Sequence, residues 1–207
     1  YVSDQTIVSV ENYKTAFILL GVYGYSYDLN NHVLTESEAS AFVELLNGGG
    51  SVYMEGGDTW AFDSQTSLHG MFGLSGESDG SGDLSTLSGV SGTFSEGMTF
   101  TYNGDNSYID RIVPSGGFAI LNNNDPSYTI AIAYDNPIAG YKTIGASHDL
   151  GGLQGEDFNA YISGVLQYLA VGSGGIEPEC VIGDVNGDGS INVADVVVNV
   201  NIVLGTN

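Results

Sequence analysis

The residues best suited to chemistry lie near the end of the sequence, where oxygen-bearing side chains recur within twelve positions. The segment 184–195 carries them at positions 1, 3, 5, 9 and 12, and position 7 offers a backbone carbonyl. The expected ligands are Asp184, Asn186, Asp188, Ser190, Asn192 and Asp195. A hard cation such as Ca²⁺ needs six or more oxygens, and the loop surrounds it only if the chain turns sharply at position 6, where Gly189 stands. The spacing predicts a calcium-binding loop, with Ca²⁺ as cofactor.

A short helix is expected directly after this loop, over 196–204. Its apolar face consists of Val196, Val197, Val200 and Val203. An isolated helix of this length is only marginally stable in water, so it must pack against something else. The candidates are the main domain, a missing second half of the same module, or another copy of the chain.

Loop and helix together, over 183–205, resemble one type I dockerin repeat, with Asp195 in place of the usual terminal Glu and without the first flanking helix. The resemblance implies a cohesin-like partner. Dockerins pair two such repeats and this sequence shows one, which leaves that partner open. Cys180, the single cysteine, cannot form an internal disulfide. It is either an inert buried thiol, a free thiol or a link to another chain.

The first part of the sequence predicts a strand, a helix and a second strand. Residues 15–20 form an apolar run typical of a strand buried on both faces. Thr35 and Glu38 have the spacing of a capping box at the start of a helix over 35–46, and Gly48–Gly50 ends it. A strand over 51–55 follows. Strand, helix and strand at this spacing predict a right-handed βαβ crossover, the unit of a parallel sheet.

This order resembles the flavodoxin-like core of class I glutamine amidotransferases, over roughly residues 13–170. The resemblance implies an α/β fold with a mostly parallel sheet, and a nucleophilic cysteine after the second strand. Glu55 occupies that position, and a carboxylate cannot form the thioester of this chemistry. The family activity is therefore expected to be absent.

His148 follows a late strand, where the resemblance implies a catalytic histidine. Glu55 and His148, joined by Asp58, are the candidate catalytic residues for acid–base work. A structural or solvated histidine is the alternative.

A doubly wound domain normally begins with a βα unit ahead of the strand at 15–20, and residues 1–13 are too few to supply it. The domain is expected to lack this first unit. The strand edge left open could pair with another chain, which favours a homo-oligomer or polymer.

Further strands are expected at 99–102, 118–121, 128–134 and 141–146, and a final helix at 157–169. The expected organisation is an α/β domain over 1–171, a linker over 172–179, and a half-dockerin calcium-binding segment over 180–207.

Composition narrows the function classes. Three basic residues stand against 25 acidic ones, a net charge of −22. Such a surface repels nucleic acid and anionic membranes and attracts cations. No apolar run is long enough to cross a bilayer. Abundant Gly, Ser, Asn and Tyr, and a start at Tyr1 without a basic leader, favour a processed protein that is secreted or on the cell surface.

Three functions are consistent with these observations. The first is an extracellular calcium-binding assembly protein with a non-catalytic, amidotransferase-like main domain. The second is a secreted hydrolase tethered by its dockerin-like tail. The third is a carbohydrate- or surface-binding adhesin.

Overall fold

The computed structural model describes residues 13–22 and 33–170. The chain divides into two compact units, Tyr1–Val171 and Gly172–Asn207. The predicted linker and the predicted calcium ligands, Asp184 to Asp195, lie outside the described residues, as does Cys180.

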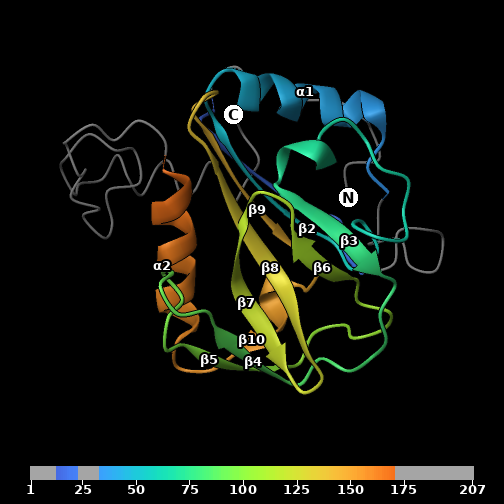
Figure 1. Ribbon diagram of the computed structural model, residues 1–207, viewed down its shortest axis with the longest axis vertical. Coiled ribbons are helices and arrows are strands. Elements are labelled where there is room, and N and C mark those ends of the chain that lie inside the picture. Colours follow the sequence, from blue (N-terminus) through green and yellow to red (C-terminus); the bar gives the residue numbers. More distant parts are fainter. Residues whose placement is uncertain (1–12, 23–32, 171–207) are drawn as a thin grey trace, which may run out of the picture. The chain divides into compact units, whose positions relative to one another are not determined.

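A single mixed sheet of ten strands dominates the described part of the first unit (Figure 1). The strands are β1 (Thr15–Leu19), β2 (Ser51–Glu55), β3 (Leu74–Ser78), β4 (Thr86–Gly89), β5 (Thr99–Tyr102), β6 (Arg111–Pro114), β7 (Phe118–Asn124), β8 (Ser127–Asn136), β9 (Tyr141–Ala146) and β10 (Leu153–Gln154). Their order is β1-β2-β9-β8-β7-β4-β5-β10, and β3 and β6 form a branch that pairs with β8. The described residues also form the 3₁₀ turns η2 (His69–Met71) and η3 (Leu150–Gly152).

The predicted βαβ unit is present. Helix α1 (Glu36–Asn47) connects β1 to β2, and these strands pair in parallel from Thr15 opposite Ser51 to Leu19 opposite Glu55. The capping box is also confirmed. The Thr35 hydroxyl accepts a hydrogen bond from the Glu38 amide, and the Glu38 carboxylate accepts one from the Thr35 amide at 2.8 Å. Gly50, which follows the helix, has no room for a Cβ because the Leu45 side chain would lie 2.5 Å away.

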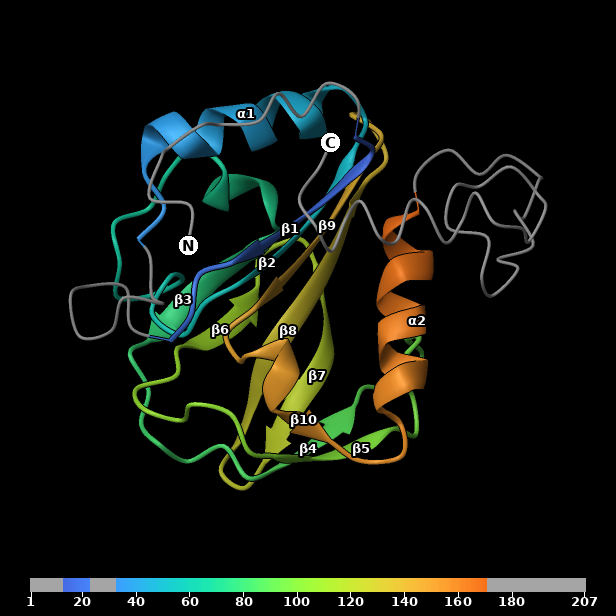
Figure 2. The same cartoon turned by 180° about the vertical axis from the view of Figure 1, so that it is seen from behind.

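The two α-helices pack on opposite faces of the sheet (Figures 1 and 2). Alternate residues of a strand point to opposite faces. Val52 and Met54 share one core with α1, while Tyr53 shares the other with α2 (Phe158–Leu169). Every residue of β2 is therefore buried.

A flavodoxin-like, mostly parallel sheet was expected, and this expectation is wrong. Among the strands that the structure describes, β1 with β2 and β2 with β9 are the parallel pairs, and the other pairs are antiparallel. Two residues connect β7 to β8 and four connect β8 to β9. A parallel neighbour would need a crossover of a dozen or more residues. The sheet also curls, since β4, β5 and β10 run across one end of the long strands (Figure 1).

Strand β1 lies at one edge of the sheet, and among the described residues it pairs with β2 alone. Its expected burial on both faces is wrong. Ile18 is buried, but Phe17 is 42% and Leu19 62% exposed. The apolar run at 15–20 therefore belongs to an edge strand with one uncovered face.

Replacing Thr35 tests whether its side chain caps α1. Thr35→Ala removes the hydroxyl that accepts from the Glu38 amide, so we expect the free energy of unfolding to fall by about 1 kcal/mol. Thr35→Ser keeps the hydroxyl and should match the parent in chemical denaturation. Equal losses in both variants would contradict the capping assignment.

Candidate functional site

Glu55 ends β2 and is held in place rather than presented to solvent. Its Oε2 accepts hydrogen bonds from the Tyr53 hydroxyl at 2.8 Å and from the Leu150 amide at 2.9 Å. Tyr53 lies two residues earlier on the same face of the strand, and Phe17 of β1 stacks on its ring with centroids 5.2 Å apart. Only 6% of Glu55 is exposed. The segment after β9 thus closes over this carboxyl group.

Burial sets the protonation of Glu55. Desolvation, with a smaller contribution from the nearby Asp149 carboxylate, raises its pKa from 4.5 to about 7. The hydrogen bonds from Leu150 and Tyr53 oppose it because they stabilise the charged form. A carboxyl group that titrates near neutrality can exchange protons, but here it has almost no contact with solvent.

His148 lies just past the carboxyl end of β9, at the sheet edge where β2 also ends, because Glu55 pairs with Ala146. It is fully buried, and neither ring nitrogen has a well-formed hydrogen bond to any described residue. Burial lowers its pKa to about 4, with a weak opposing effect from the Ile130 backbone. The imidazole is therefore neutral at physiological pH. Glu55 and His148 thus lie at the same end of strands β2 and β9, but no hydrogen bond joins their side chains.

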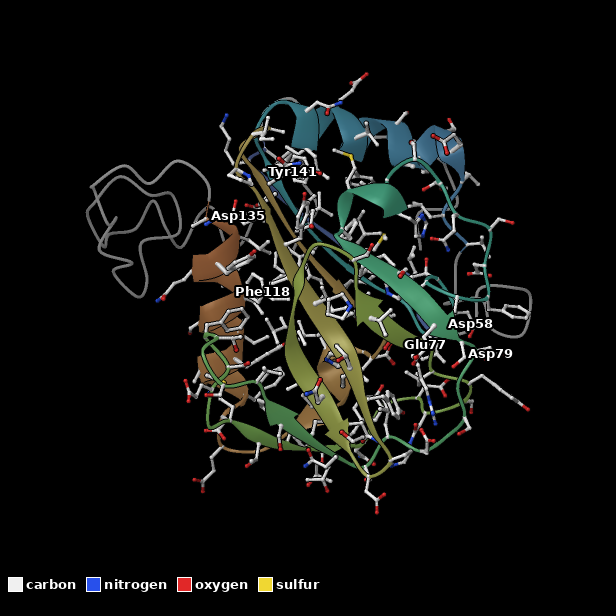
Figure 3. The ribbon with its side chains drawn as sticks, viewed as in Figure 1. Asp58, Glu77, Asp79, Phe118, Asp135 and Tyr141 are labelled. Atoms are coloured by element: carbon white, nitrogen blue, oxygen red, sulfur yellow. The ribbon has the colours of Figure 1, made fainter. Side chains whose placement is uncertain are left out.

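Asp58, the third sequence candidate, groups with carboxylates other than Glu55. One carboxylate oxygen from each of Asp58, Asp79 and Asp110 lies within 4.8 Å of the others. Asp58 follows β2, Asp79 follows β3, and Asp110 precedes β6. Figure 3 shows Asp58 and Asp79 close together beside the end of β3. Oxygen ligands of this kind suit a hard divalent cation.

Asp110 anchors this carboxylate cluster. It is fully buried, and its Oδ2 accepts hydrogen bonds from the backbone amides of Trp60 at 2.8 Å and Ala61 at 2.7 Å. Its own amide donates to the Gly57 carbonyl at 2.8 Å. Desolvation, together with the charges of Asp58 and Asp79, raises the pKa of Asp110 to about 7 against the two amide hydrogen bonds, which lower it.

Two glycines allow the loops of the cluster to approach. A Cβ on Gly80, next to Asp79, would lie 1.9 Å from the Ile109 carbonyl oxygen, which is backbone and cannot move aside. A Cβ on Gly57, next to Asp58, would lie 2.7 Å from Val22. Because glycine has no Cβ, it lets two backbone segments approach this closely.

Sequence reasoning missed Asp79 and Asp110. Their only signal was the Asp–Gly pairing of residues 79 and 80, which is also common in ordinary turns. The two aspartates meet because β3 pairs with β6, an antiparallel pair that the sequence analysis did not predict.

Of the four aromatic residues between positions 51 and 72, which could line a ligand cleft, three are core. Trp60, Phe72 and Tyr53 are buried, whereas Phe62 is exposed. No helix among the described residues is long and apolar enough to span a membrane.

No family model matches the chain, and no curated protein matches it. Solved structures share its fold at low identity. A β-galactosidase of Rahnella sp. R3 superposes with a TM-score of 0.54 at 9% identity, over 77% of this chain and 23% of the enzyme. The N-terminal domain of IFT52 gives 0.56 at 16% identity, over 82% of this chain and 84% of that domain. A cytoplasmic protein of Salmonella typhimurium gives 0.52 at 14% identity, over 82% of this chain and 76% of that protein. The chain thus spans under a quarter of the β-galactosidase but most of the other two, and these similarities establish the fold alone.

The raised pKa of Glu55 gives a test in pH. The folded state holds this proton more tightly than the unfolded state does, so the associated stability is present below about pH 4.5 and is lost as pH rises through about 7. Glu55→Gln removes that loss while keeping an acceptor for Tyr53 and Leu150. Relative to the parent, the variant should gain up to about 3 kcal/mol of unfolding free energy between about pH 5 and pH 8.

Chemical denaturation of both proteins at the two pH values measures this gain. Glu44→Gln, an exposed glutamate of α1, is the matched control and should change equally little at both. A Glu55→Gln variant that follows the parent at each pH would contradict the assignment.

Proposed function

We propose that this chain is an extracellular, calcium-binding structural protein whose main domain is non-catalytic and assembles through the open edge of its sheet. The observation that carries the proposal is β1, an edge strand with apolar side chains exposed. Phe17 and Leu19 are 42% and 62% exposed, on a strand that pairs only with β2 among the described residues.

The backbone of β1 also suits pairing with another chain. The Leu20 amide donates to the Glu55 carbonyl at 3.0 Å, which directs it toward β2. Successive amides of a strand point to opposite sides, so the Leu19 amide is directed to the open edge. Exposed donors and acceptors beside apolar side chains form a template for strand addition. A second copy of this chain is the proposed occupant.

The burial of the candidate catalytic residues supports a non-catalytic main domain. The position that the amidotransferase resemblance assigns to the nucleophile is Glu55, which is 6% exposed and hydrogen-bonded to Tyr53 and Leu150. His148 is fully buried. The hydrolase alternative would require both groups to reach substrate. The adhesin alternative would require an exposed aromatic platform, and Trp60, Phe72 and Tyr53 are instead buried.

Calcium enters the proposal through the loop 184–195. Its ligand spacing and the net charge of −22 support a bound cation that orders the segment 180–207. A cohesin-like protein or a second dockerin half are the other partners that this segment could engage. The abundance of Gly, Ser, Asn and Tyr supports secretion or display at the cell surface.

A charge on the open edge should prevent assembly. Leu19→Lys places an ammonium group among the apolar side chains of β1, a device by which natural edge strands avoid pairing. We expect light scattering coupled to gel filtration to show oligomers of the parent and monomers of the variant. Ile138→Lys, at a 97% exposed site between β8 and β9, is the matched control and should leave the oligomers intact. A monomeric parent, or an oligomeric Leu19→Lys variant, would overturn assembly through β1.

Calcium removal tests the second half of the proposal. With Asp184, Asp188 and Asp195 all changed to Asn, the loop loses its three carboxylates, so calcium should no longer protect residues 183–205 from hydrogen exchange. In the parent, chelation should abolish that protection. Protection that is the same in the parent with calcium, the parent with chelator and the variant would contradict the loop assignment.

A further inference from the structure

The carboxylate cluster of Asp58, Asp79 and Asp110 belongs to the main domain and shares no residue with the calcium loop predicted by the sequence. We propose that it is a second site for a hard divalent cation, calcium or magnesium. The three carboxylates come from three loops, and one oxygen of each lies within 4.8 Å of the other two. A cation between them would bind all three loops together.

The unpaired Oδ1 atom of Asp110 is the independent observation. Its Oδ2 is occupied by the amides of Trp60 and Ala61, but its Oδ1 is buried and accepts no hydrogen bond from any described residue. A buried carboxylate oxygen without a partner costs free energy unless a ligand satisfies it. A cation bound among the three aspartates would satisfy it.

The distribution of basic residues strengthens this inference. The Arg111 guanidinium pairs with Asp83 at 3.0 Å and lies over the Tyr128 ring, while the Lys142 ammonium lies over the Tyr168 ring. Lys14, the third basic residue, precedes β1. Because β1 and β2 run parallel, Lys14 lies at the opposite end of this strand pair from Asp58, which follows β2. Among the described residues, no basic side chain thus forms an ion pair with Asp79 or Asp110.

The ligand atoms decide the class of cation. Three carboxylates without sulfur or imidazole suit Ca²⁺ or Mg²⁺ rather than zinc or copper. Asp110 is buried and Asp79 is exposed, so the site has a closed inner side and an open outer side. Water would complete the coordination from the open side.

The only tryptophan of the chain provides a local reporter. Trp60 donates its backbone amide to Asp110, so Tb³⁺ bound at the cluster should be sensitised by excitation at wavelengths where only tryptophan absorbs. The experiment uses the full chain with Asp184, Asp188 and Asp195 changed to Asn, which silences the C-terminal loop. We expect Tb³⁺ emission that saturates at one equivalent and is displaced by Ca²⁺ or by Mg²⁺; the stronger competitor identifies the preferred ion.

Asp79→Asn in the same background tests the ligands, because Asp79 is exposed and its loss leaves the Asp110 anchor intact. It should weaken Tb³⁺ binding about tenfold or more. Asp135→Asn removes an equivalent exposed charge from β8, far from the cluster in Figure 3, and should not weaken it. Absent emission, or equal affinities in the Asp79 and Asp135 variants, would overturn the site. Neither result bears on assembly through β1 or on the C-terminal loop.

Discussion

The structure depends on the complete burial of β2. Its five residues lie between α1 on one face and α2 on the other, with β1 and β9 as parallel neighbours. An apolar strand in this position fixes the direction in which its carboxyl end leaves the sheet. Glu55 and the turn that leads to Asp58 are therefore positioned by packing several residues earlier. Both groups of functional candidates depend on the same strand.

The burial of β2 also explains why Glu55 and the carboxylate cluster of Asp58, Asp79 and Asp110 differ in their exposure to solvent. Glu55 leaves β2 on the face of Tyr53 and is sealed by the segment that carries Leu150, with hydrogen bonds that satisfy its Oε2. Asp58 follows two glycines, where the chain turns toward Trp60 and Asp110. Glu55 is closed off from solvent by its own domain, whereas Asp79, the exposed member of the cluster, leaves that group accessible to an ion. Only three basic residues are available to a chain with 25 acidic ones, so acidic clusters cannot all be neutralised internally.

Sequence reasoning succeeded where the signal was local. The capping box of Thr35 and Glu38, the βαβ unit, and the segments that became β5, β7, β8, β9 and α2 all follow from short-range patterns.

Sequence reasoning failed where the pairing partners of a strand decide its place in the sheet. The sequence of an apolar run such as 15–20 does not show whether the strand lies at the edge or at the centre of a sheet, because its burial depends on neighbours distant in sequence. The resemblance to a parallel fold rested on one crossover, and the two- and four-residue connections of β7, β8 and β9 determined the rest. Asp79 and Asp110 were missed for the same reason: β3 and β6 lack strong β-forming runs, and their pairing is not encoded locally.

Strand β9 has a neighbour of each kind: it pairs with β2 in parallel and with β8 in antiparallel direction. On the β8 side the partners are joined by short turns, so their loop-closure entropy is small. On the β2 side the partners are separated by most of the domain, and their pairing carries a larger entropic cost. The β7–β8–β9 meander can thus form from local contacts and serve as the surface on which the βαβ unit condenses. The change of strand direction at β9 therefore favours a folding order in which β8 pairs with β9 before β2 does.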